Sequence, residues 1–556
     1  MGKAKSKVRI VFLGGLDGIG KNMMAFECDD TIVLVDAGMM FPDDEMLGID
    51  KVIADLTYVR DNKEKIKALV LTHGHEDHIG AIRNLFDEVS VPIYGTKLTL
   101  ILAKNKLKRE QYEDEMLHEV SPRSKVEIGP FTFEFIRVCH SIPDCVGLAI
   151  NTPQGMIVHS GDFKIDYTPI DGQAIDLNRF AEIGDEGVLA LLTDSTNADT
   201  PGYNLSEKTV GETFHTLFRR YQANRIIIVS FASNIHRIQQ AIDAAKEHNR
   251  KVLVIGRSME ESVSVARKHG YINCPESIFA SISDIKSLPP NKAVIITTGS
   301  QGERMSVISR MAYDSYKGIT LNEKDCVILS SAPIPGNEKG VNTVINEITR
   351  KGAQVVYEAN YEVHVSGHAC IDELKLMTSL VKPKYLIPVH GEHRHLEANA
   401  SIGVTMGIPR ENVFVLDNGD VLEFSASKAA VVDHVPGEAI LLDGFAEEDR
   451  FNIVQTDRRK LAKDGILVVS MALREDNKDL LSEVKLNSRG FIYMSEDLAL
   501  KESITDRVIQ IHKEYKKESD GGSTKGFKKY LNKRLADYIY QLTKRRPMIL
   551  PVILMV

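Results

Sequence analysis

Four candidate metal ligands lie within six residues of one another in the segment THGHEDHIG, residues 72–80, directly after an apolar run. His73 and His75, at positions i and i+2 of an extended backbone, point to the same side and can bind one ion. Asp77 and His78, at the start of the following predicted helix, can bind a second ion. Imidazole and carboxylate ligands suit Zn²⁺ or Mn²⁺. The segment therefore restricts the chain to folds that place a metal centre at the carboxyl end of a strand.

The first two hundred residues alternate short apolar runs with polar or glycine-containing turns, which is typical of buried strands with functional ends. Three more residues of ligand type follow such runs: His140 after FTFEFIRVC, Asp162 at the end of MIVHSGD, and His390 after YLIPV. Asp162 has the chemistry to bridge two ions, as a two-metal hydrolase requires. Asp36, in VLVDAG, is either a partner of a ligating histidine or a turn residue, and the sequence leaves both interpretations open.

The pattern of apolar runs also divides the chain. Helices and strands alternate through residues 206–355, which predicts a parallel sheet with crossover helices. Residues 356–432 return to strand-end histidines and so belong with residues 1–205, which makes the middle segment an insertion. A third unit is expected in residues 433–556. The sequence thus predicts an α/β protein with a discontinuous first domain.

Charge and composition exclude several classes of protein. The net charge of −8 argues against a general DNA-coating protein, although residues 501–550 carry 13 Lys/Arg against 6 Asp/Glu. No apolar stretch reaches the ~20 residues that span a bilayer, and the N-terminus lacks a secretion signal. Six scattered cysteines without a CxxC pair predict a reduced, cytoplasmic protein. GLDGIGKN, residues 15–22, approximates a P-loop, but Asn22 replaces the Mg²⁺-binding hydroxyl, so no nucleotide cofactor is expected.

Several motifs together resemble a known family. HxHxDH with later His and Asp ligands resembles the metallo-β-lactamase superfamily, and the α/β insertion resembles its β-CASP branch. Over essentially its whole length the chain is similar to bacterial ribonuclease J. The motifs that carry this similarity are LGG-x-x-x-IGKN (13–22), HSIPD (140–144), FASNIHR (231–237), GSQGE (299–303), PIPGN (333–337) and TKRRPMILP (543–551). The resemblance implies an αββα sandwich, an inserted β-CASP α/β domain and a small α+β C-terminal domain.

The resemblance also implies an activity. It implies a metal-dependent phosphodiester hydrolase that degrades single-stranded RNA as a 5′-to-3′ exonuclease and endonuclease, prefers 5′-monophosphate ends, and acts in mRNA decay and rRNA maturation. The implied catalytic residues are Asp77, which orients the nucleophile, Asp194 in TDST, and one histidine of HVSGH. His364 and His368 both match that histidine, and His368 is the candidate general acid. The implied 5′-phosphate pocket consists of Ala232, Ser233, Asn234, His364, Val365, Ser366, Gly367 and His368, although Ser233 alone would more often be a helix N-cap.

Assembly and further ligands are implied by the resemblance as well. It implies homodimers or tetramers, or a heteromer with a sister chain, joined largely through the C-terminal unit. The apolar strand 548–556 needs a partner, which is either ILVVSMAL (466–473) alone or, in addition, a neighbouring subunit. A structural Ca²⁺ held by Asp50 and Asp443 is a further implication. Two alternatives stay open: a small-molecule metallo-hydrolase of the same superfamily, and a weakly active paralogue that serves mainly as a structural partner.

Overall fold

The computed structural model describes the chain except residues 1–5, 43–45, 47, 302–305, 317, 334–336, 427, 444–450, 493–496 and 519–522. The chain forms two compact units, one of residues 1–41 and 51–440 and the other of residues 42–50 and 441–556. The predicted divisions at residues 206, 355 and 433 stay predictions.

Two sheets form the centre of the first unit. The larger has the order β21-β20-β1-β2-β3-β6-β7-β8, with bounds β1 Val8–Gly14, β2 Met23–Cys28, β3 Thr31–Val35, β6 Ile66–Val70, β7 Ile93–Gly95, β8 Leu117–Glu119, β20 Asp420–Phe424 and β21 Ala429–His434. The smaller has the order β19-β13-β12-β11-β10-β9, with bounds β9 Lys125–Ile128, β10 Phe131–Arg137, β11 Val146–Thr152, β12 Gly155–His159, β13 Val188–Asp194 and β19 Pro383–Val389. The short strands β4 (Met39–Met40) and β5 (Lys51–Ile53) pair antiparallel.

The two sheets share one apolar core, to which alternate residues of both contribute. Phe26 of β2 and Phe133 of β10 meet edge to face across it, with ring centroids 6.5 Å apart. Each buried phenylalanine stabilises the fold by roughly 1.5–3 kcal/mol. Both sheets are therefore held face to face, so the carboxyl ends of their central strands are fixed relative to one another.

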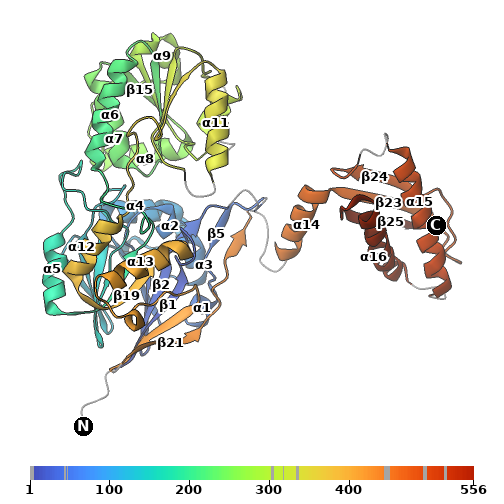
Figure 1. Cartoon of the computed structure of the whole chain (residues 1–556), viewed down its shortest axis with the longest axis horizontal. Coiled ribbons are helices and arrows are strands. Elements are labelled where there is room, and N and C mark those ends of the chain that lie inside the picture. The colour runs from blue at the N-terminus through green and yellow to red at the C-terminus, as the bar shows by residue number, and fades with distance from the viewer. Residues whose placement is uncertain are drawn as a thin grey trace. The chain divides into compact units, whose positions relative to one another are not determined.

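Helices cover the outer faces, which completes the four-layer αββα arrangement. Helices α5, α12 and α13 pack together beside β13 and β19 (Figure 1). The helices of this part are α1 Thr57–Asp61, α2 Glu76–Ile79, α3 Ile82–Glu88, α4 Lys97–Lys106, α5 Leu177–Glu186, α12 Ile371–Val381 and α13 His393–Thr405.

A five-stranded parallel sheet with the order β15-β16-β14-β17-β18 lies within the predicted insertion. Its side chains alternate between two cores, one shared with α6 and α7 and the other with α10 and α11, so helices flank both faces (Figure 1). The elements are α6 Glu207–Arg220, β14 Arg225–Val229, α7 Ile235–Glu247, β15 Lys251–Ile255, α8 Arg257–Lys268, α9 Ile282–Ser287, β16 Ala293–Thr297, α10 Val307–Ala312, β17 Asp325–Leu329, α11 Glu338–Arg350 and β18 Gln354–Val356.

The second unit contains a small sheet and two long helices. Strand β25 (Met548–Met555) pairs in parallel with β23 (Ile466–Leu473), which is the local partner considered for the C-terminal strand. The other elements are α14 Phe451–Asp464, β24 Lys485–Arg489, α15 Leu498–Glu518 and α16 Thr524–Thr543. Strand β22 (Ile440–Leu442) begins at the last residue of the first unit. Among the described residues, no helix is both long and apolar enough to cross a membrane.

Candidate metal centre and active site

The predicted ligands all leave the carboxyl ends of strands in the αββα sandwich. His73 and His75 follow β6, and α2 then carries Asp77 and His78. Outside this segment, His140 follows β10, Asp162 follows β12 and His390 follows β19. The apolar strands thus bring ligands from four separate parts of the sequence to one place.

Three histidines form the first cluster. The ligand nitrogens of His73, His75 and His140 lie within 4.8 Å of one another. His75 Nδ1 is 3.1 Å from His73 Nε2 and 3.0 Å from His140 Nε2. Burial and the neighbouring imidazoles hold the pKa values of His73 and His140 well below the ordinary range, and burial lowers the pKa of His75 to about 4. The three rings are therefore neutral and turn their nitrogens toward a common point, as ligands of one metal ion do.

The second cluster mixes carboxylates and imidazoles. Asp77, His78, Asp162 and His390 bring their ligand atoms within 4.8 Å of one another, and His390 Nε2 lies 3.0 Å from Asp77 Oδ2. Burial alone would lower the pKa of His390, but the carboxylates of Asp162 and Asp77 outweigh it and raise that pKa to about 9. The two carboxylates of this cluster thus stabilise positive charge beside them, which a metal ion would supply in place of the imidazole protons.

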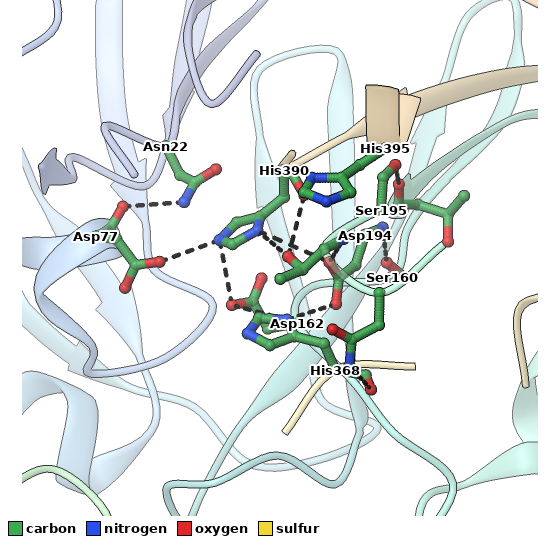
Figure 2. Close-up of polar contacts among 12 residues, drawn as sticks. Asn22, Asp77, Ser160, Asp162, Asp194, Ser195, His368, His390 and His395 are labelled. Carbon is green, nitrogen blue, oxygen red and sulfur yellow. Dashed lines mark hydrogen bonds and ion pairs between the residues drawn. The ribbon is translucent and has the colours of Figure 1, made fainter. Parts of the chain in front are cut away.

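Asp162 Oδ2 lies close to ligand nitrogens of both clusters. Figure 2 shows the Asp162 carboxylate beside His390 of the second cluster. Asp162 is 2% exposed, and no hydrogen bond joins its Oδ2 atom to another described residue. The distances from Asp162 Oδ2 are 3.2 Å to His78 Nε2, 3.5 Å to His390 Nε2, 3.6 Å to His73 Nε2 and 3.8 Å to His140 Nε2. A buried carboxylate oxygen without a hydrogen bond is destabilising unless a cation compensates it. The donor set therefore fits divalent metal ions.

A second layer of contacts orients the ligand rings. The Nδ1–H group of His78 donates a hydrogen bond to Asp36 Oδ2 (2.8 Å), and that of His140 donates one to the carbonyl oxygen of Gly367 (2.7 Å). Thr196 Oγ1 lies 2.6 Å from His390 Nδ1. Each contact leaves the Nε2 atom of the histidine for a metal ion. The contact with His78 favours the first interpretation of Asp36, whereas Thr196 and Gly367 were not expected to orient ligands.

Asp36 provides a test of this layer. Its Oδ1 and Oδ2 atoms also accept hydrogen bonds from the backbone N and hydroxyl of Thr72, each 2.8 Å long. Because asparagine cannot accept all of these bonds, Asp36→Asn should weaken metal binding by about 10–100-fold. Chelator competition followed by elemental analysis measures this. Asp29→Asn, in the exposed turn between β2 and β3, is the control, and equal metal affinity for both variants would contradict the assignment.

Asp194 and His368 lie beside the metal ligands (Figure 2). The Nδ1–H group of His368 donates a hydrogen bond to Asp194 Oδ2 (2.8 Å), and the same nitrogen is 4.0 Å from Asp162 Oδ2. Burial would lower the pKa of His368, but the Asp194 carboxylate outweighs it and raises that pKa. His364 is absent from the ligand groups found among the described residues and instead contacts Arg237. Of the two histidines left open in HVSGH, His368 is therefore the one beside the ligands.

The residues expected in the phosphate pocket come from two loops. Ala232, Ser233 and Asn234 form the turn between β14 and α7, and residues 364–368 precede α12. The side chain of Asn234, rather than Ser233, caps α7 by accepting from the backbone N of Arg237, so the N-cap considered for Ser233 is wrong. Ser366 Oγ accepts hydrogen bonds from Asn197 Nδ2 (2.8 Å) and from the backbone N of His368 (3.2 Å).

The glycine-rich segment that approximates a P-loop supports the metal-binding turn. Asn22 donates to the carbonyl oxygen of Asp77 from both its backbone N (3.0 Å) and its side-chain Nδ2 (3.1 Å). Gly38 packs against the same carbonyl so closely that an added Cβ would lie 1.6 Å from it. The strand β2 begins directly after Asn22, where a P-loop would open a helix. Neither contact with the Asp77 carbonyl had a signal in the sequence.

Asp50 and Asp443, expected to hold a calcium ion, both belong to the second unit. The Asp443 carboxylate forms an ion pair with Arg458 (2.9 Å). Neither aspartate belongs to a group of three or more neighbouring ligand residues in the described part of the chain.

Comparisons with known proteins agree with this geometry. Family models match along the chain: the metallo-beta-lactamase superfamily at 17–177, the ribonuclease J beta-CASP domain at 223–348, the Zn-dependent metallo-hydrolase RNA specificity domain at 352–415 and the ribonuclease J C-terminal domain at 453–556. Ribonuclease J2 of Bacillus subtilis is 43% identical over 554 residues, which cover 99% of each chain. The chain belongs to the ribonuclease J family.

Other relatives span the same length. Ribonuclease J 1 of Streptococcus pyogenes is 41% identical over 99% of this chain and 98% of its own, and ribonuclease J of Synechocystis is 40% identical over 99% and 86%. A crystal structure of a protein of unknown function from Enterococcus faecalis covers 75% of this chain and 100% of its own with a TM-score of 0.53 at 15% identity, and supports the fold alone.

The predicted fold class and enzyme class are therefore confirmed. This member of the ribonuclease J family is a metal-dependent ribonuclease with a metallo-β-lactamase, a β-CASP and a C-terminal domain. The small-molecule hydrolase alternative is wrong, because the RNA specificity and β-CASP models both match.

Proposed function

We propose that the chain degrades single-stranded RNA as a 5′-to-3′ exonuclease and endonuclease, prefers 5′-monophosphate ends, and acts in mRNA decay and rRNA maturation. The position of Asp162 Oδ2 between two ligand clusters carries the proposal. In it, His73, His75 and His140 hold one Zn²⁺ or Mn²⁺ ion, and a second ion binds the cluster of Asp77, His78 and His390, with Asp162 as ligand to both.

The reaction divides between the ions and the chain's own residues. When bound, the two ions would lower the pKa of water and neutralise charge on the phosphoryl oxygens. Asp77, 27% exposed at its side chain, can orient the attacking water. His368 supplies the proton that the leaving 3′-oxygen needs, and Asp194 holds the His368 ring and raises its pKa, which favours the acid form.

In this proposal two loops, residues 232–234 and residues 364–368, recognise the substrate end. The N-terminus of α7 at Asn234 offers backbone N–H groups, and the Ser366–Gly367 turn offers small polar groups. The carbonyl oxygen of Gly367 also accepts a hydrogen bond from the ligand His140, which ties this loop to the metal centre. A pocket of this kind suits one terminal phosphate at a fixed distance from the ions.

RNA that carries a 5′-monophosphate should be degraded at least about tenfold faster than the same RNA with a 5′-triphosphate, because in this proposal the two loops bind a single terminal phosphate. Single-turnover assays on oligonucleotides that differ only at the 5′ end measure this. Cleavage of a circular RNA of the same sequence reports endonuclease activity separately. Equal rates on both linear substrates would remove the 5′-end preference and leave the endonuclease in place.

Assembly through the second unit is also part of the proposal. The outward side chains of the edge strand β25, Leu550, Val552 and Leu554, are 48%, 39% and 62% exposed, and such a face needs a cover. The double variant Val552→Glu/Leu554→Glu should therefore be monomeric. The control Leu542→Glu, at an exposed position of α16, should keep the assembly of the unaltered protein. Deleting residues 444–556 should also give a monomer with much lower RNA affinity and activity. Light scattering that shows the same subunit count for the unaltered protein, both glutamate variants and the truncated protein would contradict this.

Two minor expectations are retained as proposals. Asp50 and Asp443 hold a structural Ca²⁺, which elemental analysis after dialysis against Ca²⁺ would detect and Asp443→Ala would remove.

The chain is active alone, because every ligand position is occupied by a ligating residue type. Activity that appears only after mixing with a sister ribonuclease J would instead support the structural-partner alternative.

A further inference from the structure

Arg237 is a fully buried arginine that reaches HVSGH from the β-CASP domain. It lies on α7 with 0% exposure, and its guanidinium holds Glu207 of α6 through two hydrogen bonds, Nε to Oε1 (2.7 Å) and Nη2 to Oε2 (2.8 Å). Its third nitrogen, Nη1, donates to the carbonyl oxygen of Ser330 (2.9 Å) and to Nδ1 of His364 (3.1 Å). The guanidinium is thus fixed on three sides.

This contact determines which nitrogen of His364 carries the proton. A guanidinium has only donors and stays protonated in proteins, so Nδ1 of His364 must accept. The single ring proton is therefore on Nε2, and no hydrogen bond joins Nε2 to another described residue. Burial, Arg237 and the nearby Lys164 hold the pKa of His364 well below the ordinary range, so a second proton does not add near neutral pH.

We propose that Arg237 is a positioning residue that fixes His364 as the neutral Nε2–H tautomer, and that this N–H donates a hydrogen bond to the 5′-terminal phosphate of the RNA. The second half rests on the proposed 5′-end preference. Glu207 makes the arrangement compatible with burial, because its carboxylate neutralises the Arg237 charge.

A neutral donor has a consequence for specificity. A cationic imidazolium would attract a triphosphate more strongly than a monophosphate, because the triphosphate carries more negative charge. A neutral N–H gives one directional hydrogen bond and no advantage to added charge. The Arg237–His364 contact therefore favours discrimination by shape and direction, which suits a pocket for one phosphate.

The first test reads the tautomer without any RNA. In full-length protein with ring-¹⁵N histidine, the His364 signals, assigned by their loss in His364→Asn, should show the Nε2–H tautomer unchanged from pH 6 to pH 8. In Arg237→Lys, one ammonium cannot hold both Glu207 oxygens and Nδ1, so His364 should titrate or change tautomer. An imidazolium or an Nδ1–H ring in the unaltered protein at pH 7 would overturn the role of Arg237.

The second test measures the ratio of kcat/KM for 5′-monophosphate RNA to that for 5′-hydroxyl RNA. Arg237→Lys and His364→Asn should each lower the ratio about tenfold, and the double variant should lower it no further, because both act through one N–H. In His364→Asn the side-chain amide oxygen can still accept a hydrogen bond from Arg237, so a lower ratio in this variant does not come from loss of that contact. Arg219→Lys, exposed on α6, should leave the ratio unchanged. Additive effects of the two substitutions would overturn the proposal. A ratio near one in the unaltered protein would overturn the 5′-end preference and the phosphate contact. The tautomer of His364 would then still be decided by the first test.

Discussion

Asp162→Asn should abolish RNA cleavage and lower the content of divalent metal below two ions per chain. Asp162 Oδ2 lies within 3.8 Å of Nε2 atoms from both ligand clusters, so its loss should remove a ligand from both proposed ion sites. Asparagine has the same shape but no charge, and its amide cannot compensate two cations. We expect activity to fall by at least about 10³-fold, more than removal of one neutral transition-state donor causes.

The experiment pairs single-turnover RNA cleavage with elemental analysis of the same samples. Asp185→Asn is the matched control, because Asp185 is 73% exposed at its side chain and pairs only with the surface Lys382 among the described ion pairs. Thermal melting of both variants checks that the fold is intact. An Asp162→Asn protein that keeps two ions and cleaves RNA at the original rate would show that Asp162 is not the shared ligand.

His368→Gln should lower kcat by about 10²–10⁴-fold and leave the metal content unchanged, since its proposed role is to protonate the leaving 3′-oxygen. Asp194→Asn should change the pH dependence of kcat. The Asp194 carboxylate raises the pKa of His368, which keeps the acid form present to higher pH. Without that carboxylate the pKa falls, so the loss of kcat on the alkaline side should move to lower pH.

A substrate with sulfur in place of the leaving 3′-oxygen separates this role from a structural one. A thiolate leaves without a proton, so the defect of His368→Gln should shrink to within a few-fold on that RNA. His434→Gln, an exposed histidine paired with Asp420, is the control and should behave like the unaltered enzyme on both substrates. A His368→Gln defect of equal size on both substrates would contradict the general-acid role.

The metal ligands could be predicted because their signal lies in local sequence. His73, His75, Asp77 and His78 follow one strand, and the polar ends of apolar runs mark His140 and Asp162. Asp194 and His368 came from family resemblance, and the structure places His368, rather than His364, beside the ligands. The strands were recognisable because they are buried on both faces and read as continuous apolar runs.

The contacts that orient those ligands could not be predicted. Thr196 and His390 are 194 residues apart, and His140 and Gly367 are 227 apart. A carbonyl acceptor such as that of Gly367 has no sequence signal, because every residue has one. Arg237 was visible in FASNIHR, but its burial against Glu207 depends on how α6 and α7 pack. Such residues are fixed by tertiary packing rather than by local pattern.

Two divalent ions should bind on either side of Asp162. Anomalous diffraction from crystals grown with Mn²⁺ or Zn²⁺ would locate them. We expect two peaks per chain, one among His73, His75 and His140 and one among Asp77, His78 and His390, both within bonding distance of Asp162. A single peak, or peaks away from Asp162 in metal-loaded and active protein, would contradict it.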